Sequence, residues 1–200
     1  VLLERDVKLL VVACNSAAAA ALETLQQQLD IPVIGVIEPG LRAAARVTRS
    51  GRIGVIGTVG TVASGAYQRV ADELAGIELT CAACPGFVEF VEAGDVDSDQ
   101  VHVLAERLLA PVRAATVDTL VLGCTHYPLL ARTIGDVMGR SVVLVSSADE
   151  TAFAVRALLT DREMLASGSD AEGDPRHVFF TSGRVDTFRT LGVRFLGPEV

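Results

Sequence analysis

Two cysteines of this chain, Cys14 and Cys124, stand in matching local sequences. Each follows an apolar run, over 10–13 and 120–123, and each precedes small polar residues and a helix-forming stretch. This pattern predicts a thiol at the carboxyl end of a buried strand and beside a helix N-terminus, where negative charge on sulfur is favoured. Two such thiols facing each other would form an acid–base pair.

Inverting the α-carbon of an amino acid without a cofactor needs a base on one face and an acid on the other. A thiolate and a thiol can exchange these roles, and general acid–base help of this kind contributes roughly 10²–10⁴-fold per group. A single buried cysteine is more often a small hydrophobic residue, but here polar side chains adjoin both thiols. These neighbours are Asn15, Ser16, Thr125 and His126.

Strand and helix signals alternate along the whole chain, which predicts an α/β fold. Because the strand–cysteine–helix unit occurs twice, we expect two similar lobes, each a mostly parallel sheet flanked by helices. The active site would lie in the cleft between them, outside the carboxyl ends of the strands. The predicted first lobe comprises residues 1–38 and 147–200, and the second comprises residues 39–146.

The apolar patterning also predicts individual elements. Strands are expected over 9–13, 33–37, 52–56, 77–82, 119–123, 142–145 and 178–181. Helices are expected over 17–29, 41–49, 85–93, 148–160 and 185–191. Three further helices are expected: one ends near Gly76, one is capped by Ser98, and one has Pro128 in its first turn. Pro39 and Gly40 are interpreted as a break, and 167–176 as a loop. The candidate hinges between the lobes are Glu38–Gly40 and Ser146–Ser147.

Composition excludes several functional classes. Half of the 200 residues are hydrophobic but only 4% are aromatic, which is typical of parallel sheets covered by helices. No apolar run reaches the roughly 18 residues of a membrane span, and we expect a cytoplasmic protein. The net charge of −8 argues against nucleic-acid binding. The only lysine, Lys8, precedes a strand, which argues against pyridoxal phosphate chemistry.

The remaining cysteines and the histidines offer weaker signals. Cys81 and Cys84 have the spacing of a redox motif, but Cys81 falls inside a predicted strand. A thiol oxidoreductase therefore stays an alternative. The three histidines are scattered and lack the spacing of zinc ligands, so no metal is expected.

The segments Ala-Cys-Asn-Ser-Ala at 13–17 and Leu-Gly-Cys-Thr-His-Tyr-Pro at 122–128 resemble the two signature motifs of the glutamate racemase family. Stretches at 34–40, 54–67 and 83–92 are similar to that family too. The resemblance implies cofactor-independent interconversion of L- and D-glutamate, in which Cys14 takes the α-proton of D-glutamate and Cys124 that of L-glutamate. Glutamate would be bound by Asn15, Ser16, Thr125 and His126.

Further expectations follow from the same resemblance. His126 would assist Cys124, with Glu92 behind it, while Thr58 and Thr61 rank lower as carboxylate ligands. Where this chain has Ser16 the family usually has Thr, so a hydroxyl is kept. The family supplies D-glutamate for peptidoglycan, which implies a bacterial cytoplasm, a small-molecule substrate, and neither a nucleic-acid partner nor a membrane. Family members dimerise in more than one way, so a homodimer stays open.

The family's opening Asp-Ser-Gly motif and its later Tyr-Gly segment would precede Val1. The resemblance therefore predicts a chain shortened at its N-terminus and leaves the activity of this polypeptide by itself open. Two alternatives also remain. One is a racemase of another amino acid such as aspartate, and the other is a catalytically incomplete fragment acting as a binding protein, a gyrase inhibitor.

Overall fold

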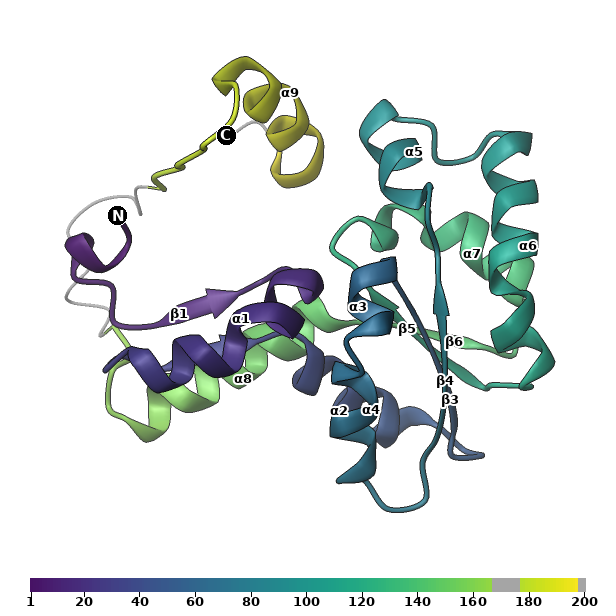
Figure 1. Ribbon diagram of the computed structural model, residues 1–200, viewed down its shortest axis with the longest axis horizontal. Coiled ribbons are helices and arrows are strands. Elements are labelled where there is room, and N and C mark those ends of the chain that lie inside the picture. Colours follow the sequence, from purple (N-terminus) through teal and green to yellow (C-terminus); the bar gives the residue numbers. More distant parts are fainter. Residues whose placement is uncertain (167–176, 198–200) are drawn as a thin grey trace. The chain divides into compact units, whose positions relative to one another are not determined.

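The computed structural model describes residues 1–166 and 177–197, in two compact units, Val1–Met164 and Leu165–Val200 (Figure 1). The elements of the first unit, in chain order, are η1 (Leu3–Arg5), β1 (Leu10–Val12), α1 (Asn15–Gln28), β2 (Val33–Gly35), α2 (Ile37–Val47), β3 (Arg52–Gly57), α3 (Val59–Ala63), α4 (Ala66–Asp72), β4 (Glu78–Ala83), α5 (Phe87–Ala93), α6 (Asp99–Ala114), β5 (Thr119–Gly123), η2 (Tyr127–Leu130), α7 (Ala131–Met138), β6 (Val143–Ser146) and α8 (Ser147–Asp161).

Four of these strands form a parallel sheet in the order β4-β3-β5-β6. The neighbours of β3 lie on opposite sides of it, so the winding of the chain changes direction between β3 and β5. In open α/β sheets, ligands bind outside the carboxyl ends of the strands at such a point. The two ends are level here, because Gly57 of β3 pairs with Gly123 of β5.

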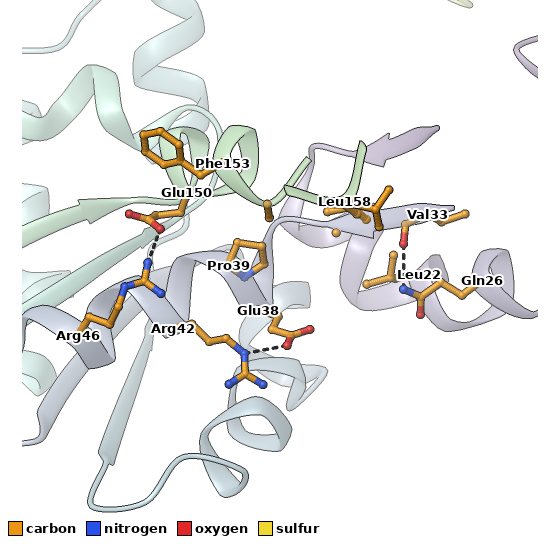
Figure 2. Close-up of a pocket in the computed structure, with 13 residues that line it drawn as sticks. Leu22, Gln26, Val33, Glu38, Pro39, Arg42, Arg46, Glu150, Phe153 and Leu158 are labelled. Carbon is orange, nitrogen blue, oxygen red and sulfur yellow. Dashed lines mark hydrogen bonds and ion pairs between the residues drawn. The ribbon is translucent and has the colours of Figure 1, made fainter. Parts of the chain in front are cut away.

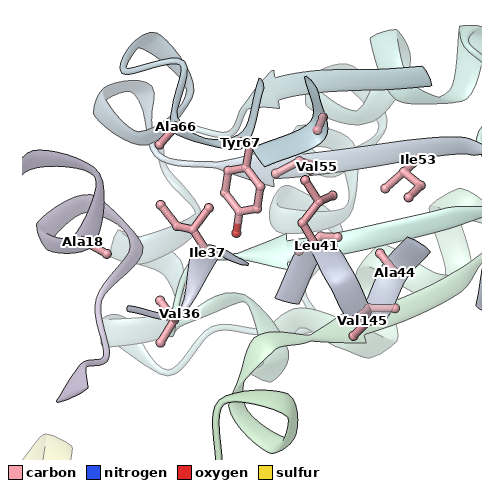
Figure 3. Close-up of a cluster of buried hydrophobic side chains, with 13 residues drawn as sticks. Ala18, Val36, Ile37, Leu41, Ala44, Ile53, Val55, Ala66, Tyr67 and Val145 are labelled. Atoms are coloured by element: carbon pink, nitrogen blue, oxygen red, sulfur yellow. The ribbon is translucent and has the colours of Figure 1, made fainter. Parts of the chain in front are cut away.

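Successive side chains of a strand point to opposite faces, and both faces of this sheet are covered. On one face, Ile53, Val55 and Val121 pack in a buried cluster with residues of α2 and α4 (Figure 3). On the other face, α6 packs against β3 and β4. Burial on both sides explains why β3 and β5 consist of almost uninterrupted apolar residues.

The other two strands, β1 and β2, form a second parallel sheet, in which Val12 pairs with Gly35. Helix α1 packs against both strands, and α8 packs against β2 and α2. The predicted α/β class with parallel sheets flanked by helices is therefore confirmed. The predicted lobe boundaries stay a prediction.

The expected break at Pro39 and Gly40 is wrong, since α2 begins at Ile37 and runs through both residues. Pro39 lies in the first turn, where the N–H that proline lacks would have no partner within the helix. Gly40 is buried against the start of α8: a Cβ there would lie 2.8 Å from the Cβ of Ser147. These residues thus serve close helix packing rather than a turn.

The second unit contains α9 (Val185–Leu196), as the sequence predicted. The expected strand over 178–181 is not formed. A strand needs a partner for its backbone hydrogen bonds, and the described residues of this unit contain no other strand. The ring of Phe179 instead lies 6.0 Å from that of Phe188 in α9. The predicted loop over 167–176 lies outside the described residues.

Candidate functional site

Cys14 lies where the sequence predicted, between the end of β1 and the start of α1. It is the N-cap residue of α1, with an extended backbone (φ −105°, ψ 125°), and its side chain is exposed. The first N–H groups of a helix lack partners within the helix and carry partial positive charge. This position therefore favours a negatively charged sulfur or a bound anion.

Cys124 directly follows β5 and is 8% exposed. The expected helix after it is interrupted, since a short 3₁₀ helix, η2, precedes α7. Two residues on, His126 turns back toward the cysteine, with Nδ1 3.8 Å from the Cys124 Sγ. The Nε2 atom of the same ring lies 3.3 Å from Oε1 of Glu92. The imidazole thus contacts the thiol through one nitrogen and the carboxylate through the other, as in sites where a positioned base activates a cysteine.

The environment of Cys124 acts on its ionisation in both directions. Burial raises the pKa of this thiol, the backbone N–H of His126 lowers it, and a negative charge on Cys14 raises it again. The hydroxyl of Thr125 lowers the pKa as well. The net effect is a raised pKa, and the two cysteines are close enough to interact electrostatically. Ionisation of one thiol therefore disfavours ionisation of the other, which favours a thiolate–thiol pair.

Three hydroxyl groups join the segment after Cys14 to the end of β3. The Oγ of Ser16 lies 2.9 Å from the Oγ1 of Thr58 and 3.0 Å from that of Thr61, and the two threonine oxygens are 3.0 Å apart. Thr58 is the N-cap residue of α3 and follows Gly57, which pairs with Gly123. This triangle places the Cys14 segment beside the strand ends that lead to Cys124.

Asn15 is held by a residue whose role the sequence did not predict. The hydroxyl of Tyr67, in α4, donates a hydrogen bond of 2.8 Å to the Oδ1 of Asn15, and both side chains are buried. The available signal was general: a tyrosine in an apolar helix face usually needs a partner for its hydroxyl when it is buried. The sequence offered no way to identify that partner.

A cavity of about 450 Å³ adjoins this group of residues. It is lined by residues on both cysteine segments, including Ala13 next to Cys14, and Cys124 with Thr125. Serine and threonine side chains at the start of α8 supply most of its other polar groups. Its volume is in the range of small-molecule sites. Of the six predicted site residues, Cys124 and Thr125 line this cavity. The other four, Cys14, Asn15, Ser16 and His126, are not among its lining residues, although Cys14 directly follows the lining residue Ala13.

A second cavity, of about 560 Å³, lies among α1, β2, α2 and α8 (Figure 2). Arginine side chains line it, but they are paired: Arg42 with Glu38 at 2.8 Å, and Arg46 with Glu150. No cysteine lines this cavity. The chemistry that the sequence predicts is therefore associated with the first cavity.

The other two cysteines are poorly suited to redox chemistry. Cys81 is within β4 and Cys84 follows it, and burial raises the pKa of the first to about 11 and of the second to about 12. Within residues 1–166 and 177–197, no three His, Cys, Asp or Glu side chains are grouped as metal ligands would be. None of the described helices is long and apolar enough to cross a membrane.

Comparison with known proteins finds matches over nearly all of the chain. The family model described as Asp/Glu/Hydantoin racemase matches residues 2–155. A glutamate racemase of Geobacter metallireducens is 52% identical over 200 residues, which cover 100% of this chain and 73% of that protein.

Solved structures agree. A glutamate racemase from Bacillus anthracis superimposes with a TM-score of 0.91 at 44% identity, covering 98% of this chain and 73% of the other. A glutamate racemase from Francisella tularensis, solved in complex with D-glutamate, gives a TM-score of 0.87 at 28% identity, with 98% and 72% covered.

Proposed function

This chain belongs to the family of aspartate and glutamate racemases, and on that premise we propose that it interconverts L-glutamate and D-glutamate without a cofactor, using Cys14 and Cys124 as acid and base. The observation that supports the proposal best is that segments adjoining both cysteines, Ala13 on one side and Cys124 with Thr125 on the other, line the same cavity. Each thiol would serve one face of the substrate, in the cleft between the two proposed lobes.

With D-glutamate as substrate, the Cys14 thiolate removes the α-proton. The C–H bond breaks, an S–H bond forms, and the electron pair remains on the α-carbon, delocalised into the adjacent carboxyl group. The Cys124 thiol then gives its proton to the opposite face. The product is L-glutamate, with Cys14 now a thiol and Cys124 a thiolate. L-Glutamate reacts by the same steps in reverse.

The neighbours of the cysteines would bind the charged groups of glutamate. Asn15 and Ser16 beside Cys14, and Thr125 and His126 beside Cys124, offer amide, hydroxyl and imidazole groups. The partial positive charge at the α1 N-terminus favours a carboxylate there. His126, held by Glu92, would assist proton transfer at Cys124. A protonated imidazole beside a thiolate stabilises its charge.

The family resemblance also suggests a biological role. We propose that the product D-glutamate is consumed in peptidoglycan synthesis in a bacterial cytoplasm.

A substrate panel tests the proposal. The purified protein is incubated separately with L-glutamate, D-glutamate, L-aspartate and D-aspartate, and optical rotation or circular dichroism is followed to equilibrium. We expect both glutamate enantiomers to converge on zero signal. Aspartate should react about 10- to 200-fold more slowly, the discrimination available from one methylene. Faster turnover of aspartate would identify another amino-acid racemase, and no turnover of any substrate would contradict the proposal.

A further inference from the structure

The amide of Asn15 has one satisfied and one unsatisfied end. Its Oδ1 accepts the hydrogen bond from Tyr67. Its Nδ2 is fully buried and has no hydrogen-bond partner among the described residues. The residue as a whole is 2% exposed. Buried polar groups are nearly always paired, so an exception calls for an explanation, such as a ligand that is bound during function.

Tyr67 is suited to hold this amide in one orientation. The residue is 1% exposed, and burial raises the pKa of its hydroxyl well above the ordinary value, so the group keeps its proton at physiological pH. It donates this proton to the Asn15 Oδ1. A donor requires the oxygen end of the amide. Donation to Oδ1 therefore leaves the NH₂ end available for another partner.

The tyrosine hydroxyl also has little room to move. A Cβ at Gly123 would lie 3.0 Å from the Tyr67 oxygen and 2.6 Å from the backbone oxygen of Ile56, so glycine at this position allows the hydroxyl to lie close to the β5 backbone. Gly123 immediately precedes Cys124, and Asn15 immediately follows Cys14. The Tyr67 hydroxyl is thus packed between the backbone that leads to one cysteine and the side chain next to the other.

We propose that Tyr67 is a positioning residue for glutamate binding: its hydroxyl fixes the Asn15 amide so that the NH₂ group donates to a carboxylate of the substrate. The inference rests on the proposed function, because it takes the ligand of that NH₂ group to be glutamate. An anionic oxygen is a suitable partner for a buried, unpaired N–H donor. Without the tyrosine hydroxyl, the amide could rotate and present its oxygen, which would repel a carboxylate.

The test compares Tyr67→Phe with Tyr127→Phe. Tyr127 is the matched control, because it is also fully buried and its hydroxyl donates to a backbone oxygen, that of Cys84, at 3.1 Å. For Tyr67→Phe we expect KM for both glutamate enantiomers to rise about tenfold with kcat within about threefold of wild type, the pattern of lost uniform binding. For Tyr127→Phe, KM stays within about twofold. Thermal unfolding reports the stability of both variants.

A double-mutant cycle with Asn15→Ala separates positioning from a structural role. If Tyr67 acts through Asn15, Tyr67→Phe has no further effect on KM in the Asn15→Ala background. Three results would overturn the inference while leaving the proposed function intact. The first is an unchanged KM in Tyr67→Phe, and the second is an equal increase of KM in the two tyrosine variants. The third is a full further increase of KM when Tyr67→Phe is added to the Asn15→Ala background. A wild-type protein that does not racemise glutamate would overturn both.

Discussion

Replacing Gly123 by alanine should destabilise the protein at the point where the two cysteine segments meet. The new Cβ would lie 2.6 Å from the backbone oxygen of Ile56 and 3.0 Å from the hydroxyl of Tyr67. Ordinary contacts begin at 3.4 Å, so β3 and β5 would have to separate by several tenths of an ångström. The backbone oxygen cannot move away as the end of a flexible side chain could.

The magnitude follows from two opposing effects. Overpacking of this kind costs roughly 1–3 kcal/mol, and replacing glycine by alanine in a strand returns about 0.5–1 kcal/mol. The 2.6 Å approach to a backbone oxygen places the overpacking cost in the upper part of its range, about 2–3 kcal/mol, so the free energy of unfolding should fall by roughly 1–2 kcal/mol. At about 2–4 °C per kcal/mol for a protein of this size, Tm should fall by roughly 2–8 °C.

Thermal unfolding followed by circular dichroism measures this effect, and Gly60→Ala is the matched control. Gly60 is exposed, lies in α3, and has no atom within 4 Å of a Cβ placed there. Its replacement should leave Tm unchanged or raise it slightly, because alanine favours the helix by about 1 kcal/mol. Equal Tm values for Gly123→Ala and wild type would refute the argument from close packing.

Other measurements test separate parts of the structure. The Asp118 carboxylate is partly buried, which by itself raises its pKa. It accepts hydrogen bonds from the Thr48 Oγ1 at 2.5 Å and from the Arg49 and Ser50 N–H groups at 2.8 and 2.7 Å. These hydrogen bonds outweigh the burial, so the pKa is lowered overall. A carboxyl group whose pKa is lowered by folding stabilises the folded state at pH values above its pKa in the unfolded chain, which is near 4. This stabilisation is lost as the pH falls below that value. Asp118→Asn should therefore reduce the free energy of unfolding by roughly 1 kcal/mol at pH 7; urea titrations should show this difference shrink below pH 4, and a constant difference would contradict it. With iodoacetamide under native conditions, mass spectrometry should find exposed Cys14 labelled early and buried Cys84 only after unfolding; early labelling at Cys84 would contradict its burial.

Local patterns in the sequence were sufficient for most of the first unit. The strand predicted over 119–123 is observed with those bounds as β5, and Ser98 caps α6 through a hydrogen bond from the Val101 N–H. These features depend on short-range effects, namely burial of an apolar run and satisfaction of free N–H groups.

Other predictions failed where long-range packing outweighs local preference. Pro39 and Gly40 favour a turn by themselves, but the close approach of Gly40 to Ser147 makes them part of a helix. The apolar run over 178–181 has the composition of a strand and lacks a strand partner within its unit. Neither outcome could be deduced without the three-dimensional arrangement.

The candidate site shows the same division. Spacing and residue type identified Cys14, Cys124 and their polar neighbours. The contacts that arrange them join residues far apart in the chain, such as Asn15 with Tyr67, and they depend on the register that aligns β3 with β5. Sequence patterns contain no information on that register.

In the proposed mechanism, Cys14 and Cys124 act on opposite faces of one substrate. Its most direct test is α-proton exchange in D₂O, followed by ¹H NMR, for Cys14→Ser and Cys124→Ser with each glutamate enantiomer. The two-base mechanism predicts that neither variant racemises glutamate. Cys14→Ser should exchange only the α-proton of L-glutamate, and Cys124→Ser only that of D-glutamate. Racemisation within tenfold of the wild-type rate by either variant, or exchange of the same enantiomer by both, would contradict it.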